Sequence, residues 1–518
     1  MNRLFKRTGS ARPGKSVFDL SYRKLMTANM GILYPVIHDE AVPGDVFEFG
    51  VDMLIRLQPL VAPAMHPITA TLHVYFVPDR LLMSVDDYED DVDWETFITG
   101  GEDGDDESDL PRWSPSSTAV GSLWDYFGFP TGVTPTGRLP LAFPLRAYNK
   151  IWNTYYRDVD LDDEINEATS EVLLRRRWEK DYFTSARSMQ QLGTAPALPV
   201  SGMVPVTGIG KASQTYGWTG IGVYETDGSG TRTYSDLEQI DDQVLDHKFY
   251  VEEDPDNAGF PNIRADLSKG TTFDVSDFRT TLAVQHWMER NMRGGVRYNE
   301  FLRMHFGDTG YSDARLDRPE YIGGSRVPVV ISEVLQTSET GTTAQGTLAG
   351  HGMSVDSNFV GKYRVPEYGV FIGLLSIMPK AVYSQGINRQ WLRQDRYDFY
   401  HPEFANLSEQ AIEEVEIYAT GVESQNKTIF GYQGNYDEMR VKHSMYCGQM
   451  RIGGDFDYWH LGRNFSSRPT LNSAFIECDP GKRIFAVQDE DTFICTVGNR
   501  IRAVRPMPAI AVPGVSRV

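Results

Sequence analysis

The residues that most directly suggest chemistry lie near the start of the chain, where Gly9 to Ser16 fits the pattern G-x-x-x-x-G-K-S. In phosphate-binding loops this pattern follows a buried strand and opens a helix, so that backbone N–H groups surround a phosphate. Here only eight residues precede the pattern, and Val17 to Tyr22 lacks helical periodicity. We therefore predict a flexible basic arm over residues 1–18 rather than a nucleotide site.

The charge of the chain is unevenly distributed. The formal net charge of −21 argues against a nucleic-acid footprint over the whole surface, because phosphate binding needs clustered Lys and Arg. The arm is the exception, since its five basic residues all precede the first acid, Asp19. These five residues are the predicted nucleic-acid contacts: Arg3, Lys6, Arg7, Arg12 and Lys15.

A segment over residues 84–110, in contrast to the basic arm, is strongly acidic, and we predict that it forms a loop. Thirteen Asp or Glu occupy the twenty-four positions from Asp86 to Asp109. Closely spaced carboxylates can bind a hard cation such as calcium, and the candidates are Asp103, Asp105 and Asp106. Because the ordered ligand spacing of an EF-hand is missing, a solvated, mobile loop is the favoured interpretation, and no cofactor is predicted.

Three arginines, Arg290, Arg293 and Arg297, lie near Trp287 and Tyr298 in the sequence. Cations beside aromatic rings are typical of grooves that bind single-stranded nucleic acid. Arginine is also common at protein interfaces, where it forms ion pairs within or between subunits. We favour a contact between subunits for this trio.

Signatures of catalysis are missing from the sequence. The patterns H-E-x-x-H, G-x-S-x-G and G-x-G-x-x-G do not occur, and the ten histidines are scattered. Cys447, Cys478 and Cys495 have no C-x-x-C spacing and are predicted to be buried free thiols. No apolar run is long enough for a membrane helix. We predict that the chain is not an enzyme; the alternative is a β-sandwich that binds or cleaves carbohydrate with a carboxylate pair.

The elements that would position these residues are mainly strands. Alternation in Phe47 to Leu57 and in Ala70 to Phe76 predicts half-buried strands, and the apolar run Val370 to Met378 predicts a strand covered on both faces. Further strands are predicted at Val327 to Val334, Glu413 to Tyr418, Met439 to Cys447, Arg483 to Val487 and Phe493 to Val504, and helices at Leu145 to Tyr156, Asp277 to Asn291 and Tyr298 to His305.

About eight strands with long insertions predict a mainly β fold, an eight-stranded antiparallel jelly roll with a few short helices. We expect one domain over residues 19–518. Within it, the segment 207–272 is rich in Gly, Thr, Ser and Asp and is too long for an ordinary connection, so we predict a surface insertion. This insertion carries Tyr216, Trp218 and Tyr224.

The string from Glu289 to Gly324, ERNMRGGVRYNEFLRMHFGDTGYSDARLDRPEYIGG, resembles the major capsid proteins of the microviruses, which are small single-stranded DNA bacteriophages, and above all their gokushovirus-like branch. Other strings resemble the same family in the same order along nearly the whole chain. They are FDLS at 18–21, PGD at 43–45, LPLAFPLRAYNKIWNTYYRD at 139–158, RYDFYHP at 396–402, FGYQ at 430–433, the segment 459–477, and RPMP at 505–508.

The resemblance implies a virion protein with a viral jelly roll that assembles in the bacterial cytoplasm, through pentamers, into a small T=1 icosahedral shell around circular single-stranded DNA. It also implies further partners: a small basic internal DNA-binding protein, a pilot or minor virion protein and a host surface receptor. The insertion would form a protrusion at the threefold axes, and Tyr216, Trp218 and Tyr224 are its candidate host-attachment residues.

Overall fold

The structure is a computed structural model of the chain, and two compact units are distinguished in it. The first unit combines Met1–Leu192 with Glu289–Val518, and the second is Gly193–Met288. The residues that the structure describes are 14–83, 94–99, 110–193, 203–205, 223–224, 231–232, 264–266, 275–294, 304, 318–335, 348–405 and 409–510.

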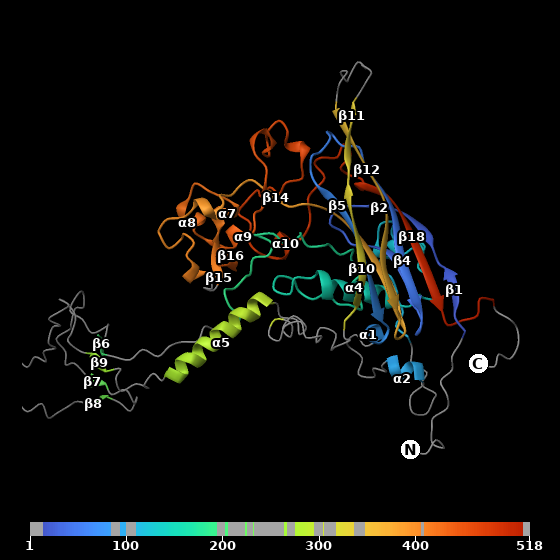
Figure 1. The fold of residues 1–518 in the computed structure, drawn as a ribbon, viewed down its shortest axis with the longest axis horizontal. Coiled ribbons are helices and arrows are strands. Elements are labelled where there is room, and N and C mark those ends of the chain that lie inside the picture. Colours follow the sequence, from blue (N-terminus) through green and yellow to red (C-terminus); the bar gives the residue numbers. More distant parts are fainter. Residues whose placement is uncertain are drawn as a thin grey trace, which may run out of the picture. The chain divides into compact units, whose positions relative to one another are not determined.

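The larger sheet of the first unit is built around β18, the last strand that the structure describes, which has neighbours on both sides (Figure 1). All of its pairings are antiparallel, so distant parts of the sequence are joined by one hydrogen-bonded ladder. Its strands in spatial order are β1 (Ser16–Asp19), β18 (Phe493–Arg505), β4 (Val46–Leu57), β12 (Leu348–Arg364) and β11 (Ile331–Leu335), with β2 (Tyr22–Ala28) also pairing with β18.

The second sheet of this unit has four strands and is also antiparallel. Every residue of its strand β13 is buried, because both faces of the strand are covered. The strands in spatial order are β10 (Glu320–Val329), β5 (Ile68–Pro78), β13 (Gly369–Pro379) and β3 (Tyr34–Ala41).

The two sheets share one apolar core. The ring of Phe371 on β13 lies with its centroid 4.6 Å from that of Phe47 and 4.9 Å from that of Phe49, both on β4 of the other sheet. It also lies 5.4 Å from the ring of Phe76 on β5. These rings are fully buried and belong to the same cluster as the inward residues of β18. The burial of this apolar surface is the main stabilising term of the sandwich.

The opposite face of β13 packs against a second layer. Ile372 and Leu374 share a cluster with α4 (Phe143–Ile151), which continues as a π-helical turn, η2 (Trp152–Tyr156). The hydroxyl of Tyr148 on α4 donates to the carbonyl of Leu33 at 2.9 Å, which ties the layer to the start of β3. The other helices of this region are α1 (Arg80–Met83), α2 (Trp94–Thr99) and α3 (Leu123–Tyr126).

The carboxy-terminal third of the chain adds short elements around a third apolar cluster. Two small sheets form here, one parallel and one antiparallel. They consist of β14 (Val382–Tyr383) with β17 (Ser444–Met445), and β15 (Glu409–Glu413) with β16 (Ile429–Gly434). The helices are α7 (Glu414–Ile417), α8 (Glu423–Asn426), α9 (Asp437–Arg440) and α10 (Ser473–Ile476), with 3-10 turns η5 (Arg389–Trp391), η6 (Pro402–Phe404), η7 (Gly448–Met450) and η8 (Asp457–Trp459).

The second unit contains two small antiparallel pairs among its described residues. β6 (Met203–Pro205) pairs with β9 (Arg264–Asp266), and β7 (Val223–Tyr224) pairs with β8 (Thr231–Arg232). The helix α5 (Val275–Gly294) begins in this unit, and its residues from Glu289 onward belong to the first.

The prediction of a mainly β fold with few short helices is confirmed, and so are its longest elements. β4, β5, β13 and β18 form where alternation or a long apolar run predicts strands, and β10 and β11 cover the predicted strand at 327–334. The predicted helices at 145–156 and 277–291 are present as α4 with η2 and as α5. The predicted helix at 298–305 lies outside the described residues except for Met304.

Three predicted strands in the carboxy-terminal third are wrong for most of their length. At 413–418 the strand β15 ends at Glu413 and the chain continues as α7, because Glu413 and Glu416 form a reciprocal capping box. At 439–447 the chain forms the end of α9 and the two-residue β17, and at 483–487 it makes only an isolated bridge through Phe485. Cys478 and Cys495 are buried as predicted, whereas Cys447 is exposed.

Replacing Phe371 by alanine should destabilise the first unit by about 3–5 kcal/mol, because it leaves a cavity among buried rings of both sheets. The matched control is Phe359→Ala on β12, whose side chain is exposed and whose loss should change stability by about 0.5 kcal/mol or less. Chemical denaturation of the two variants measures the difference. Equal losses in both would contradict the assignment of Phe371 to the centre of the sandwich.

Candidate functional site

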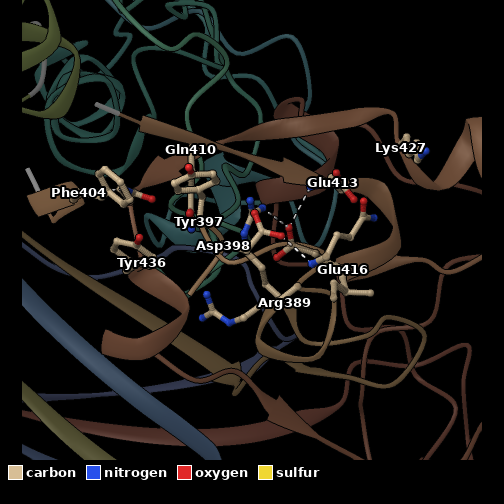
Figure 2. A pocket seen from close by; sticks show the side chains of 13 residues that line it. Arg389, Tyr397, Asp398, Phe404, Gln410, Glu413, Glu416, Lys427 and Tyr436 are labelled. Carbon is tan, nitrogen blue, oxygen red and sulfur yellow. Dashed lines mark hydrogen bonds and ion pairs between the residues drawn. The ribbon is translucent and has the colours of Figure 1, made fainter. Parts of the chain in front are cut away.

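A cavity of about 460 Å³ lies in the carboxy-terminal third (Figure 2). Its walls come from the turn η5, the loop that follows η5, the strand β15, the helix α7 and the turn between β16 and α9. Charged, amide and aromatic side chains are all present in these walls. Those labelled in Figure 2 are Arg389, Tyr397, Asp398, Phe404, Gln410, Glu413, Glu416, Lys427 and Tyr436.

Glu416 is the central acid of the cavity and is almost fully buried. Its carboxylate accepts hydrogen bonds from the guanidinium of Arg389 at 2.9 Å, from the hydroxyl of Tyr182 at 2.9 Å and from the backbone N–H of Glu413 at 3.0 Å. Burial raises the pKa of Glu416, and the positive charge of Arg389 opposes this rise. The carboxylate therefore fixes η5 and α7 to one another.

Glu438 on α9 makes a second buried ion pair. Its two oxygens accept from the Nη2 of Arg393 at 3.0 Å and from the amide of Gln410 at 2.8 Å. The side chains of Arg393 and Glu438 are 8% and 2% exposed, so little water screens the pair. This interaction joins the loop after η5 to β15 and α9, which are separated from it in sequence.

The aromatic wall of the cavity is held by backbone contacts. Tyr436 has a left-handed backbone conformation with φ 63°, which is uncommon for a residue other than glycine. This conformation places its hydroxyl 3.1 Å from the carbonyl of Phe399, to which it donates. The neighbouring Asn435 donates from its side chain to the carbonyl of Phe404 at 2.8 Å.

The chemistry available in this cavity is structural. Glu416 and Glu438 each form an ion pair with an arginine. Asp398 accepts hydrogen bonds from the backbone N–H groups of Gln394 and Asp395. The hydrogen bond from Gln394 lowers the pKa of Asp398 most strongly. In the described part of the chain no group of three or more His, Cys, Asp or Glu side chains is arranged to hold a metal ion. The charged side chains of the cavity therefore bind to one another and to the backbone, and these contacts hold the cavity walls in place.

Most of the residues predicted from sequence to contact DNA, a cation or the host lie outside the described part. These are Arg3, Lys6, Arg7, Arg12, Asp103, Asp105, Asp106, Tyr216 and Trp218, while Tyr224 is in β7. Lys15 is described, and its ammonium donates to the carbonyl of Gly44 at 2.6 Å. Because Ser16 begins the strand β1 instead of a helix, this segment lacks the helix N-terminus that a phosphate-binding loop needs.

The predicted arginine trio is divided in the structure. Arg290 is exposed on α5, and Arg297 lies outside the described residues. Arg293 forms an ion pair at 2.5 Å with Glu409, a buried residue of β15 in the same chain. A contact with another subunit stays a prediction for these residues.

The sequence does not predict the ion pairs of Arg389 with Glu416 and of Arg393 with Glu438, because the two partners of each pair are distant along the chain. A weak local signal exists, since Arg389 and Arg393 are spaced by four residues and are followed by the string RYDFYHP at 396–402. That string is one of those that resemble the microvirus capsid proteins, and its Tyr397 lines the cavity.

The described part of the chain is thus a two-sheet β-sandwich with a carboxy-terminal cavity in which Glu416 and Glu438 are paired with arginines. Comparison with known proteins identifies the class more closely. The model of the family described as capsid protein (F protein) matches residues 7–515. The chain belongs to this family.

Individual relatives agree with the family model. The capsid protein VP1 of Chlamydia phage 1 is 32% identical, covering 100% of this chain and 98% of that protein. The capsid protein VP1 of Bdellovibrio phage phiMH2K is 32% identical with 98% and 97% coverage, and that of Spiroplasma virus 4 is 30% identical with 97% and 96% coverage.

These matches confirm the resemblance to microvirus capsid proteins. The chain has the role of a major capsid protein, is structural rather than enzymatic, and is located in the bacteriophage virion, where its copies build a shell. No helix among the described residues has both the length and the apolar character needed to cross a bilayer.

Replacing Glu438 by alanine should lower the free energy of unfolding by about 3–5 kcal/mol, because the buried guanidinium of Arg393 loses its counter-charge. The matched control is Glu423→Ala, whose ion pair with Lys427 is exposed and should contribute nothing measurable. Thermal and chemical unfolding give the comparison. If both variants retained wild-type stability, the pair would not hold the loop as described.

Proposed function

We propose that the chain forms a small T=1 icosahedral shell around circular single-stranded DNA, and that its fold is the eight-stranded jelly roll. The observation that carries the fold is the strand order. The eight main strands in sequence order are β2, β3, β4, β5, β10, β12, β13 and β18. One sheet places β2, β18, β4 and β12 side by side, which are the first, eighth, third and sixth of these strands. The other sheet places β10, β5, β13 and β3 side by side, which are the fifth, fourth, seventh and second.

This interleaved order supports the proposal, because it is the order expected of the double Greek key in a jelly roll. A rigid sandwich with long loops also suits a shell subunit, since loops and a terminal arm can contact neighbours while the sheets keep their geometry. The T=1 size, and pentamers as assembly units in the host cytoplasm, follow from the resemblance to microviruses.

For the interior of the particle we propose that the arm 1–18 contacts the packaged DNA through Arg3, Lys6, Arg7, Arg12 and Lys15. Five basic residues on a chain with net charge −21 are too few to neutralise a genome. A separate small basic internal protein would therefore supply the remaining positive charge. A pilot or minor virion protein completes the proposed set of virion partners.

For the exterior we propose that the insertion 207–272 forms a threefold protrusion and contacts a host receptor, with Tyr216, Trp218 and Tyr224 as attachment residues. The proposal is supported by the compact unit Gly193–Met288, which contains the insertion and is separate from the sandwich. Arg290, Arg293 and Arg297 are proposed as contacts between subunits, Arg293 in addition to its pair with Glu409.

The shell is tested by expressing the full chain with its phage partners and examining the product by sedimentation and electron microscopy. We expect pentamers and closed particles of T=1 size. A chain that remains monomeric under all of these conditions, or that forms shells of another triangulation number, would contradict the proposal.

Deleting residues 1–15 should lower the amount of DNA retained per particle, because the five basic side chains of the arm are lost. The measurement is the ratio of absorbance at 260 to 280 nm across purified particles. Lys15→Ala in the full chain is the control and should leave ATP binding at zero, as in the wild type. Saturable ATP binding that this substitution abolishes would instead support the nucleotide-loop interpretation.

Replacing residues 207–272 with a short Gly/Ser linker should leave shells intact and abolish attachment to host cells. The physical reason is that the segment belongs to a unit distinct from the two-sheet core. Particle yield and adsorption to cells are measured in parallel. Loss of folding would show that the segment is part of the core rather than a surface insertion.

A further inference from the structure

The turn η5 and the loop that follows it expose an unusual set of aromatic side chains. Trp391 is 76% exposed, Phe399 57%, Tyr397 55% and Tyr400 49%, all within ten residues of chain. We call these four residues the aromatic surface. Soluble proteins rarely leave such groups in water without a partner, and large exposed apolar patches mark sites of association.

The backbone beneath the aromatic surface is fixed before any partner binds. Asp395 accepts the N–H groups of Tyr397 at 2.7 Å and Asp398 at 3.2 Å, and Asp398 in turn accepts those of Gln394 at 2.6 Å and Asp395 at 3.2 Å. These reciprocal contacts form a rigid turn. A pre-ordered loop loses little conformational entropy on binding, which favours tight association.

The loop is also fixed to the rest of the unit. The buried pairs Arg389 with Glu416 and Arg393 with Glu438 hold its first half. Tyr436, in its left-handed conformation, donates to the carbonyl of Phe399 and makes an edge-to-face contact with Tyr400, with ring centroids 5.1 Å apart. An uncommon backbone conformation that supports an exposed surface is a feature expected of a functional site.

Exposed aromatic side chains could be covered by single-stranded DNA or by another protein, and the charge of the loop distinguishes these two partners. From Ile387 to Phe404 the chain carries three arginines, Arg389, Arg393 and Arg396, against three acids, Asp395, Asp398 and Glu403. Two of these arginines are already neutralised by buried glutamates. A groove for single-stranded DNA needs uncompensated cations beside its stacking rings, and this surface has no excess of them.

We propose that the aromatic surface is a contact between subunits, and that its occupant is a second copy of this chain. Copies of a capsid protein surround one another in the shell, so a second copy is the partner present in every particle. Trp, Tyr and Arg are the residue types that dominate the energetics of protein interfaces. The adjoining cavity of about 460 Å³, lined by Tyr397, Phe404 and Tyr436, is open to receive a side chain of the neighbour.

The variant test uses the full chain with Trp391→Ala. Because the side chain is mostly in water, the unfolding temperature should stay within about 2 °C of the wild type, while the protein concentration needed for assembly rises at least about tenfold. Trp391→Phe should restore assembly. The matched control Val120→Ser removes another side chain, 82% exposed, and should assemble normally.

Hydroxyl-radical footprinting of the peptide 389–404 gives a readout that does not depend on a variant. Oxidation of Trp391 and Tyr397 is compared in unassembled subunits, DNA-free shells and DNA-filled particles. Protection in both kinds of shell supports the proposal. Protection only in DNA-filled particles would assign the surface to DNA, and equal oxidation in all three samples, or equal assembly defects in Trp391→Ala and Val120→Ser, would overturn the proposal.

Discussion

β13 is buried along its whole length, and the packing of its two faces holds the described layers together. Phe371 and Leu375 point into the core between the sheets, whereas Ile372 and Leu374 pack with the layer that contains α4. Near its end Met378 joins the third cluster, which also contains Ile412 of β15 and Ile417 of α7. One strand therefore contributes to three apolar clusters, so the geometry of the aromatic surface depends on the sandwich as well as on its own loop.

The long regular elements could be predicted because their signals are local. In β4 alternate residues are buried, and the sequence alternation of apolar and polar side chains reports this directly. β13 has an uninterrupted apolar run because it is covered on both faces. The number of strands and the long insertions between them predict a jelly roll, but the pairing of particular strands over hundreds of residues leaves no local pattern.

The carboxy-terminal cavity could not be predicted, and its residues show why. Glu416 and Glu438 are buried acids, whereas acidic residues are ordinarily expected on a solvated face. Their burial is possible only because Arg389 and Arg393 arrive from another segment. At 413–418 the predicted strand is a helix instead, because Glu413 and Glu416 form a capping box. The residue types of the aromatic surface can be read from the sequence. Their exposure and the rigid turn beneath them cannot be predicted from it.

The position of β18 has a consequence for how a subunit is made. This strand of 13 residues is the last that the structure describes, yet it lies between β2 and β4 and supplies Val497 and Ile501 to the core. Without it, β2 and β4 lack the strand that both of them pair with, and the core loses apolar side chains. A subunit that lacks β18 therefore has no finished sandwich to bring into a growing shell.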